Sequence, residues 1–462
     1  MTLSRIFPRL PVIGLAVALA TLTACGPAKP VLIFAPPTVT LDSSGAPRRS
    51  AAIKSVSTNF WEAMANLDTG YALRHEVDPS EREFAAALGL VMSGHHEVAA
   101  LRLDELRQTA DDNTVISASR LLLTAMLQHQ GKWKRLAELD SMGRLNSGVD
   151  GTLDKAGVEQ WSNAFSRLSP RTVSFPNEPV VVPLELSAAG TPMIRVRING
   201  RERTVWLDTG SSMSIVSESL AALSGVAPLL PDTLEVATAT GRVPARAGSI
   251  SLLEIGGIRI THTPTLIVDD ARLELRVGDG QGAPIGVRID GVIGYDLISQ
   301  TDLRIDYVNG RVVMARPDTA APALRTGRNL FWIGTPIVRL ITNSGIPLHF
   351  NLDTGAQESY STDALLSKTK PRTFVGERRL VGGLAGISII HGRFVDELRA
   401  TMAGQPVLMR KLLIFAPAFS SFVSLDGILG SDVGKNAVVR IDATNGIYRL
   451  EQPTRRGLRI SR

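Results

Sequence analysis

The sequence contains a single cysteine, Cys25, in 462 residues, so no disulfide can form within the chain. The formal net charge is +6, yet the lysines and arginines are scattered and form no basic run, which argues against nucleic-acid binding. The seven histidines do not cluster with carboxylates or cysteine at the spacing of metal ligands. The GxSxG, HExxH and Walker motifs are missing as well. We therefore expect no metal and no organic cofactor.

Long apolar runs are scarce, and the only one of note opens the chain. Arg5 and Arg9 precede an apolar stretch from Val12 to Leu22 that is too short to span a bilayer. Leu22-Thr23-Ala24-Cys25-Gly26 follows, and it resembles the bacterial lipoprotein signal. The resemblance implies that residues 1–25 are a signal peptide and that Cys25 is lipidated. The glycine after it resembles the sorting pattern for the periplasmic face of the outer membrane. The alternative is a plain secretory signal with an incidental cysteine.

Hydrophobic residues make up 44% of the chain and charged residues 20%, which is typical of a globular protein with a sizeable core. The length predicts about two to four domains. Residues 26–55 are rich in proline, alanine, serine and threonine and are interpreted as a tether, of which Val31 to Phe34 could dock as a strand.

Residues 56–165 carry apolar side chains at helical spacing and are predicted to form an α-helical domain. Two helix starts, at Gly94-His95-His96 and Gly131-Lys132-Trp133, are similar to tetratricopeptide-type helical hairpins. The domain is interpreted either as a docking platform for a protein partner or substrate, or as a packing and spacing unit. An Asp68-Thr69-Gly70 phrase in this region follows a helical pattern, and we predict a turn without a catalytic role.

A short phrase occurs twice in the rest of the chain. Residues 203–212 read RTVWLDTGSS and residues 348–357 read LHFNLDTGAQ, so a β-prone run ends in Asp-Thr-Gly each time. Each phrase is followed by Asp-Gly, two aliphatic residues and Gly, beginning at Asp290 and at Asp426. From there the copies run in step at an offset of 136 residues. A period of this size indicates a duplicated domain, because solenoid repeats are shorter.

The duplication predicts two β-rich lobes, residues 180–316 and 328–452, joined by a linker rich in alanine, proline and threonine. Each lobe contains a glycine-bearing hairpin, one at Gly241 and one at Gly382 and Gly383. Glycine suits a hairpin that moves and that approaches a substrate backbone closely. The alternative is that these are plain surface hairpins.

Two carboxylates brought face to face by a pseudo-twofold axis cannot both ionise readily, because like charges a few ångströms apart raise one pKa. Such a pair retains one proton and titrates as a unit. A water between the carboxylates can lose a proton to one of them while the other donates to a carbonyl oxygen. This chemistry hydrolyses a peptide bond without a covalent intermediate.

The paired phrases resemble the aspartic peptidases of the retropepsin type, and two such halves in one chain resemble the two-lobed pepsin plan. The resemblance covers roughly residues 180–452. It implies a mainly β, two-lobed acid-protease fold in which Asp208 and Asp353 are catalytic. The supporting loop residues would be Thr209, Gly210, Ser211, Thr354, Gly355 and Ala356, and the flaps would carry Gly241, Gly382 and Gly383.

The two copies differ after the Asp-Thr-Gly. Ser211 follows the first, whereas Ala356 follows the second. By resemblance, a hydroxyl would bond the outer carboxylate oxygen on the first side only, so the two aspartates need not be equivalent. No flap tyrosine of the pepsin kind is evident.

Taken together, the sequence predicts an envelope-anchored aspartic endopeptidase with an N-terminal helical domain. Its partners would be a polypeptide substrate, a membrane reached through the lipid, and a protein on the helical domain. One alternative is a non-catalytic peptide-binding or assembly lipoprotein that keeps the fold. Another has each lobe pairing with a copy from a second chain.

Overall fold

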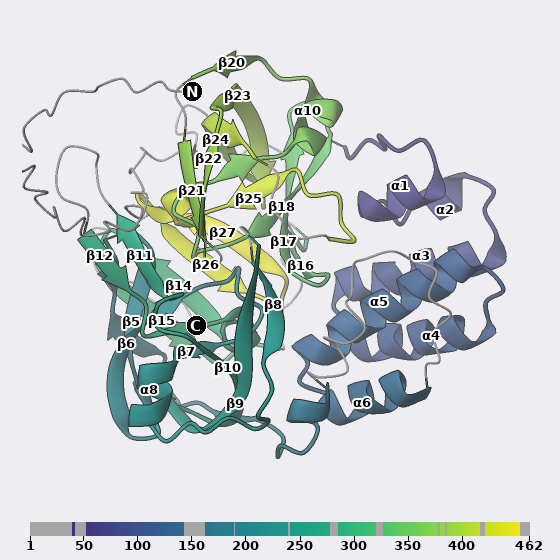
Figure 1. The fold of residues 1–462 in the computed structure, drawn as a ribbon. Helices are drawn as coiled ribbons and strands as arrows, with labels where there is room; N and C mark the ends of the chain where they lie inside the picture. Colours follow the sequence, from purple (N-terminus) through teal and green to yellow (C-terminus); the bar gives the residue numbers. More distant parts are fainter. Residues whose placement is uncertain are drawn as a thin grey trace, which may run out of the picture.

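The computed structural model describes residues 39–41, 52–142, 162–188, 190–238, 241–277, 285–319, 327–376, 379–383, 386–415 and 421–452. Helices occupy the first part of this range and strands dominate the rest (Figure 1). Cys25 and the segment from Val31 to Phe34 lie outside the described residues, so the structure does not bear on the predictions made for them. None of the described helices is long and apolar enough to cross a membrane.

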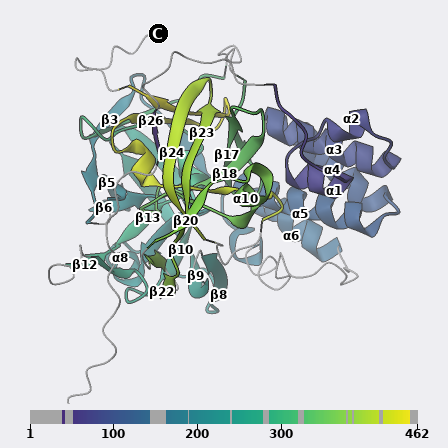
Figure 2. The same ribbon diagram turned by 90° about the horizontal axis from the view of Figure 1, so that it is seen from above.

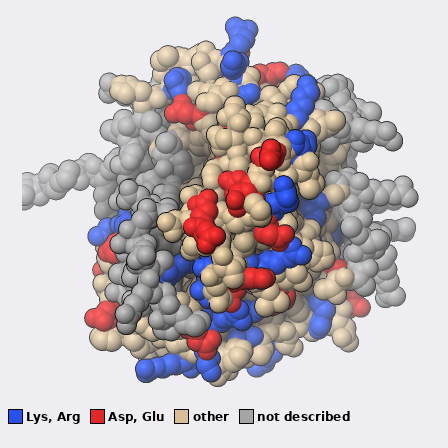
Figure 3. Space-filling view, turned by 90° about the vertical axis from the view of Figure 1, so that its right-hand side faces the viewer, with Lys and Arg blue, Asp and Glu red and all other residues tan. Residues whose placement is uncertain are grey.

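The helices lie to one side of the two lobes (Figures 1 and 2). Asp78 caps α3 with a capping box that includes Glu81, and Gly94 ends the same helix in the left-handed conformation, with φ at 84°. Acidic and basic side chains are interspersed on the outer face (Figure 3). The helices are α1 Phe60–Ala65, α2 Tyr71–Arg74, α3 Pro79–Ser93, α4 His96–Thr109, α5 Asn113–His129 and α6 Trp133–Met142.

The main sheet of the first lobe has the strand order β2-β10-β7-β13-β6-β5-β9-β8, with β4 paired to β5. The Asn199-Gly200 turn between β5 and β6 has positive φ at both residues, as a tight hairpin turn requires. The elements of this lobe are β2 Thr172–Ser174, β4 Glu185–Leu186, β5 Pro192–Ile198, β6 Arg201–Leu207, β7 Ile215–Ser217, α8 Glu218–Leu223, β8 Leu234–Thr238, β9 Gly241–Ile255, β10 Ile258–Val268, β11 Glu274–Val277, β12 Ile285–Arg288, β13 Gly291–Ile293 and α9 Tyr295–Ile298.

The second lobe repeats this plan with the order β1-β24-β19-β25-β18-β17-β23-β20, with β16 paired to β17. β6 and β18, β7 and β19, and β13 and β25 hold corresponding places, as do helices α8 and α10. The elements are β16 Leu330–Trp332, β17 Pro336–Thr342, β18 Pro347–Leu352, β19 Tyr360–Ser361, α10 Asp363–Thr369, β20 Thr373–Val375, β21 Arg379–Gly383, β22 Gly386–Ile390, β23 Arg393–Met402, β24 Gln405–Ile414, β25 Gly427–Leu429 and the 3₁₀ turn Ser431–Gly434.

A strand from the N-terminal part of the chain completes the second sheet. β1 (Val39–Leu41) pairs antiparallel with β24, and β2 pairs antiparallel with the corresponding strand β10 of the first lobe. The segment predicted as a tether therefore supplies the second lobe with an edge strand. In the first lobe the corresponding edge strand is β2, which directly precedes that lobe in the sequence.

A third sheet joins the lobes, in the order β27-β26-β14-β15-β3. β14 and β26 pair antiparallel with Arg304 opposite Arg440, which are equivalent residues of the two copies, so the pseudo-twofold axis passes between them. Arg440 bonds Asp302 through two nitrogens, at 2.9 and 3.0 Å, across this strand pair. The strands are β3 Val180–Pro183, β14 Asp302–Asp306, β15 Arg311–Ala315, β26 Val438–Asp442 and β27 Ile447–Glu451.

The helical domain packs on both lobes. His129 of α5 stacks on Trp332 of the second lobe at 4.1 Å between ring centroids and lies 5.6 Å from Tyr295 of the first lobe. Phe84 of α3 contacts Phe422, and the backbone N–H of Ser424 donates to the carbonyl of Ala65 at 2.8 Å. One apolar cluster thus joins the helices to the two lobes.

Candidate active site

The two Asp-Thr-Gly turns are delivered by equivalent strands. β6 ends at Leu207 and runs parallel to β13, while β18 ends at Leu352 and runs parallel to β25. The N–H of Asp208 then donates to the carbonyl of Ile293 at 3.0 Å, and the N–H of Asp353 donates to that of Leu429 at 2.9 Å. Each Asp-Gly phrase therefore supplies the buried strand that fixes one aspartate.

The threonines cross-link the two turns. The Thr209 hydroxyl donates to the carbonyl of Leu352 at 3.0 Å and accepts from the N–H of Thr354 at 2.9 Å. The Thr354 hydroxyl donates to the carbonyl of Leu207 at 2.7 Å and accepts from the N–H of Thr209 at 3.0 Å. Both threonines are buried. The two turns thus pair within one chain, as the intramolecular interpretation expected and contrary to the two-chain alternative.

The carboxyl groups meet above this network. Asp208 and Asp353 share a side-chain hydrogen bond. A Cβ on Gly210 would lie 2.4 Å from the Asp353 carboxyl carbon, and a Cβ on Gly355 would lie 2.5 Å from that of Asp208. Each carboxyl therefore packs against the glycine of the other turn, where no side chain fits.

The two aspartates ionise differently. Burial raises the pKa of Asp208, and hydrogen bonds from Asp353 and from backbone N–H groups of the turns partly offset this. Burial together with the neighbouring Asp208 charge raises the pKa of Asp353 well above its usual range. The pair therefore retains a proton, and we place it on Asp353.

Backbone donors explain part of this asymmetry. Asp208 Oδ1 accepts from the N–H of Gly210 at 2.8 Å and from that of Ser211 at 3.3 Å. Asp353 Oδ1 accepts from the N–H of Ala356 at 2.9 Å. Hydrogen bonds to an ionised carboxylate favour that form, so the first turn favours an ionised Asp208.

The expectation for the Ser211 hydroxyl was wrong. Instead of bonding the Asp208 carboxylate, it donates to the carbonyl of Met213 at 2.6 Å. A short serine side chain finds that carbonyl within its own turn, so the hydroxyl stabilises the loop and leaves the carboxylate to backbone donors. The two sides therefore resemble each other more closely than the Ser211 and Ala356 difference suggested.

Two supporting residues were missed from the sequence. Ser214 donates to Asp296 Oδ1 at 3.0 Å and accepts from the N–H of Gly294 at 3.1 Å. Ser359 makes the equivalent bonds, at 2.7 Å to Asp432 Oδ1 and at 2.9 Å from Gly430. Each serine lies six residues after the aspartate of an Asp-Thr-Gly turn, and this shared spacing could have identified both of them from the sequence.

Asp296 has a further partner. Arg171, from the segment after the helical domain, bonds Asp296 Oδ2 at 2.9 Å, and both side chains are largely buried. Burial raises the pKa of Asp296, while the Arg171 charge opposes the rise. The loop support in the first lobe is thus tied to the chain that leads out of the helices.

Both predicted flap hairpins exist as paired strands. β8 pairs with β9, which begins at Gly241, and β21, which ends with Gly382 and Gly383, pairs with β22. Their role as flaps over the dyad, Asp208 and Asp353, stays a prediction.

The other carboxylates singled out in the sequence lie elsewhere. Asp68 sits in the turn between α1 and α2, where its carboxylate bonds Arg74 at 2.6 Å. Asp426 is buried and bonds Lys368 at 2.9 Å, whereas Asp290 is partly exposed and pairs with Arg288 at 2.9 Å. Among the described residues no cluster of three or more histidine, cysteine or carboxylate side chains is arranged to hold a metal ion.

Comparisons with known proteins found one family match and similar solved structures. The family model described as aspartyl protease matches residues 194–297, which include the first Asp-Thr-Gly turn and Asp290. Among solved structures, the chain is similar to the crystal structure of an aspartic proteinase from Irpex lacteus, with 13% sequence identity, 60% of this chain and 97% of that chain covered, and a TM-score of 0.36. Among curated proteins, none matches the sequence. The predicted fold class, a mainly β acid-protease fold of two lobes with N-terminal helices, is confirmed.

Proposed function

We propose that the chain is an aspartic endopeptidase that hydrolyses peptide bonds through a water activated by Asp208 and Asp353. The observation that carries the proposal is the symmetric pairing of the two turns, in which two partly exposed carboxyls share a hydrogen bond above a buried threonine network. The match of the first lobe to the aspartyl protease family supports it.

The proposed mechanism follows from the protonation of the pair. Asp208, ionised, accepts a proton from the attacking water, and Asp353, protonated, donates its proton to the carbonyl oxygen of the scissile bond. A tetrahedral diol forms between the carboxyls, and its collapse returns a proton to the leaving amine. An extended substrate would lie between the lobes and bond to the flap backbone in the manner of an added strand.

We also propose that the peptidase acts at a bacterial cell envelope. The proposal depends on the resemblance of residues 1–25 to a lipoprotein signal and on Cys25 as the lipidated residue. Membrane fractionation of the full chain and of Cys25→Ser, with mass spectrometry of the mature N-terminus, tests it. Release of the variant supports the proposal, whereas equal retention of both proteins contradicts it.

Cleavage of a diverse peptide library between pH 4 and pH 8 tests the activity, with a soluble form that lacks residues 1–25. Asp208→Asn and Asp353→Asn are each expected to lower kcat by at least about 1000-fold, because both carboxyls take part in proton transfer. Asp68→Asn is the matched control, since it changes the aspartate of an Asp-Thr-Gly phrase outside the site and leaves activity unchanged.

Activity that survives either dyad substitution would refute the paired-carboxylate mechanism. Binding of peptides without cleavage at any pH would instead favour the non-catalytic peptide-binding protein. That alternative needs no proton on Asp353, so the affinity for peptide would not fall with Asp208→Asn and Asp353→Asn as the cleavage rate of an enzyme would.

A further inference from the structure

The aspartate of the Asp-Gly phrase is buried in one lobe and partly exposed in the other. Asp290 and Asp426 are equivalent by sequence, and their carbonyls accept from equivalent N–H groups, those of Ser217 at 2.9 Å and Thr362 at 3.0 Å. In the second lobe Asp426 is fully buried, and in the first lobe the Asp290 side chain is 35% exposed. The backbone is therefore conserved between the copies while the surroundings of the side chain differ.

Lysine fills the space beside Asp426 in the second lobe. Lys368 near the end of α10 is 9% exposed, and its ammonium bonds Asp426 Oδ2 at 2.9 Å. Leu348 of β18 is buried alongside. The helical domain contacts the chain two residues before Asp426, where the N–H of Ser424 bonds the carbonyl of Ala65 at 2.8 Å. The position is thus closed by a side chain of the lobe, and a segment of the helical domain lies next to it.

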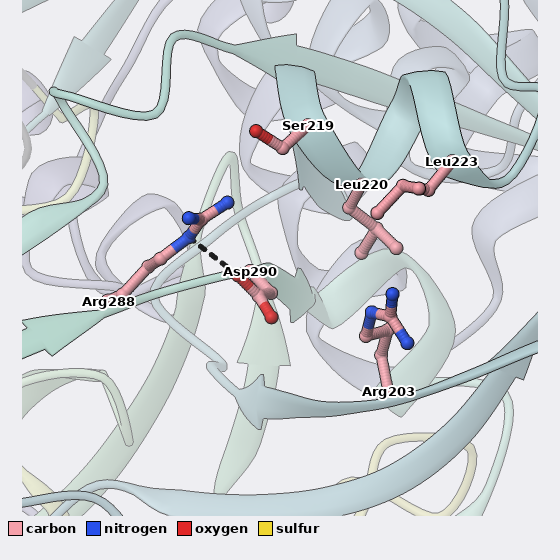
Figure 4. A pocket seen from close by; sticks show the side chains of 6 residues that line it. All are labelled: Arg203, Ser219, Leu220, Leu223, Arg288 and Asp290. Carbon is pink, nitrogen blue, oxygen red and sulfur yellow. Dashed lines mark ion pairs between the residues drawn. The ribbon is translucent and has the colours of Figure 1, made fainter.

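The first lobe has a hollow of about 460 Å³ at the equivalent place (Figure 4). Leu223 stands where Lys368 stands in the other copy, and Arg203 stands where Leu348 does. Leu223 is 57% exposed and leaves Asp290 uncovered. The lining residues are Arg203, Ser219, Leu220, Leu223, Arg288 and Asp290.

The two arginines of the hollow differ in their charge partners. Arg288 pairs with two carboxylates, Asp290 at 2.9 Å and Asp270 at 2.6 Å, which together exceed its single positive charge. Arg203 has no acidic partner within the part of the chain that the structure describes, and its one hydrogen bond is to the carbonyl of Glu202 at 2.7 Å. A guanidinium beside apolar Leu220 and Leu223 suits a carboxylate that carries an apolar group.

We propose that this hollow binds the carboxyl-terminal end of a polypeptide, with the chain-end carboxylate on Arg203 and an apolar last side chain against Leu220 and Leu223. The argument for a polypeptide is the second lobe, where Ser424, the equivalent of Arg288, bonds the backbone of another segment of the chain at Ala65. The site is separate from the dyad, because β6 carries the chain from Arg203 to Asp208 over about 16 Å. The proposal therefore stands independently of peptidase activity.

Methyl NMR of the soluble chain, with the leucine methyl groups labelled, tests the proposal. The probes are N-acetyl-leucine and N-acetyl-leucinamide, which differ only in the free carboxylate. We expect saturable shifts of the Leu220 and Leu223 methyl signals with the acid, and at least about tenfold weaker binding of the amide. N-acetyl-aspartate α-amide, which carries its carboxylate on a side chain, is expected to bind as weakly as the leucinamide.

Three variants sharpen the test. Leu223→Lys copies the lysine of the second lobe and should close the hollow by placing an ammonium on Asp290, and Arg203→Gln should remove the anion partner. Both are expected to abolish the shifts caused by N-acetyl-leucine. Arg201→Gln is the matched control on the same strand, because its exposed side chain does not line the hollow.

Equal binding of acid and amide, or shifts that persist in Leu223→Lys and Arg203→Gln, would overturn the proposal. So would the absence of any shift up to about 10 mM probe, a concentration that detects affinities weaker than 1 mM. Binding of the aspartate probe as tight as that of N-acetyl-leucine would overturn the chain-end form, since the site would then not distinguish a terminus from a side chain.

Discussion

At the scale of single residues, the approach of the two turns leaves almost no free space. Gly210 and Gly355 each face the carboxyl of the opposite turn at a distance that excludes a methyl group. The tight approach brings the carboxyls together and forces them to share a proton. The same two glycines that permit the approach are therefore the most sensitive positions of the site after the aspartates.

We predict that Gly210→Ala separates the turns. The new Cβ would meet the Asp353 carboxyl at 2.4 Å, so the turns must shift, at a cost of about 1–3 kcal/mol in stability. A displacement of this kind should lower kcat about 100-fold, because proton transfer depends on near-contact geometry. Urea unfolding and peptide cleavage measure the two effects.

Gly89→Ala provides the control for this substitution. Gly89 lies within α3, and its Cβ would meet only Thr69 at 3.7 Å, an ordinary contact. Alanine should raise stability there by about 1 kcal/mol and leave activity unchanged. If Gly210→Ala changed stability and kcat as little as Gly89→Ala does, the inference that the two turns are closely packed would be wrong.

At the scale of elements, the strand pair β14–β26 joins the lobes through a largely buried ion pair. The side chains of Arg440 and Asp302 are 20% and 11% exposed, and their two-nitrogen contact crosses the pseudo-twofold axis. The equivalent of Asp302 in the second copy is Val438, so the contact has no symmetry mate. The sheet that joins the lobes therefore contains one interlobe ion pair that departs from the symmetry.

A double-mutant cycle of Asp302→Asn and Arg440→Met is predicted to give a coupling free energy of about 1–3 kcal/mol. Each remaining charge keeps a second partner at 3.3 Å, Arg304 for Asp302 and Asp442 for Arg440, so only the cycle isolates the coupling of this pair. The exposed pair Arg102 and Glu83, at 3.2 Å, is the control and should couple by less than about 1 kcal/mol. Equal coupling in both cycles would show that the interlobe pair has no special weight.

The elements also show what the sequence could and could not specify. The duplicated turns were predictable because a β-prone run that ends in Asp-Thr-Gly admits few local structures, and two copies in register imply a shared axis. The edge strand β1 was not, since strand pairing depends on which free edge is near, and the Val39–Leu41 segment has no distinctive pattern. The Ser211 hydroxyl was misassigned because one turn offers two acceptors and only the folded loop decides between them.

At the scale of the whole molecule, the helical domain is packed into the junction of the lobes. His129 lies between the domain and both lobes, against Trp332 and Tyr295, and its Nδ1 has no hydrogen-bond partner within the described residues. Burial, together with the nearby charges of His96 and Arg171, lowers the pKa of His129 to about 3. The imidazole is therefore neutral in the folded protein.

This histidine makes stability depend on pH. The pKa of about 3 in the folded protein lies below the unfolded value of about 6.5. The contribution of neutral His129 to the free energy of unfolding is therefore fully present above pH 6.5 and is lost as the pH falls. The loss is about 1.4 kcal/mol per pH unit down to the folded pKa. We predict that His129→Phe, which keeps an aromatic ring in the stack, loses less free energy of unfolding than the parent protein when the pH falls from 7 to 4.5. Urea unfolding at both values measures this, and an identical pH dependence of the two proteins would contradict it.

The hydrogen bonds between Thr209 and Thr354 connect residues 145 positions apart, and β26, which follows both turns in the chain, pairs with β14 to join the lobes. An incomplete chain therefore carries one aspartate in an unfinished turn, with no partner to share a proton. The duplication thus delays the pairing of the two carboxyls until both turns have been synthesised and folded.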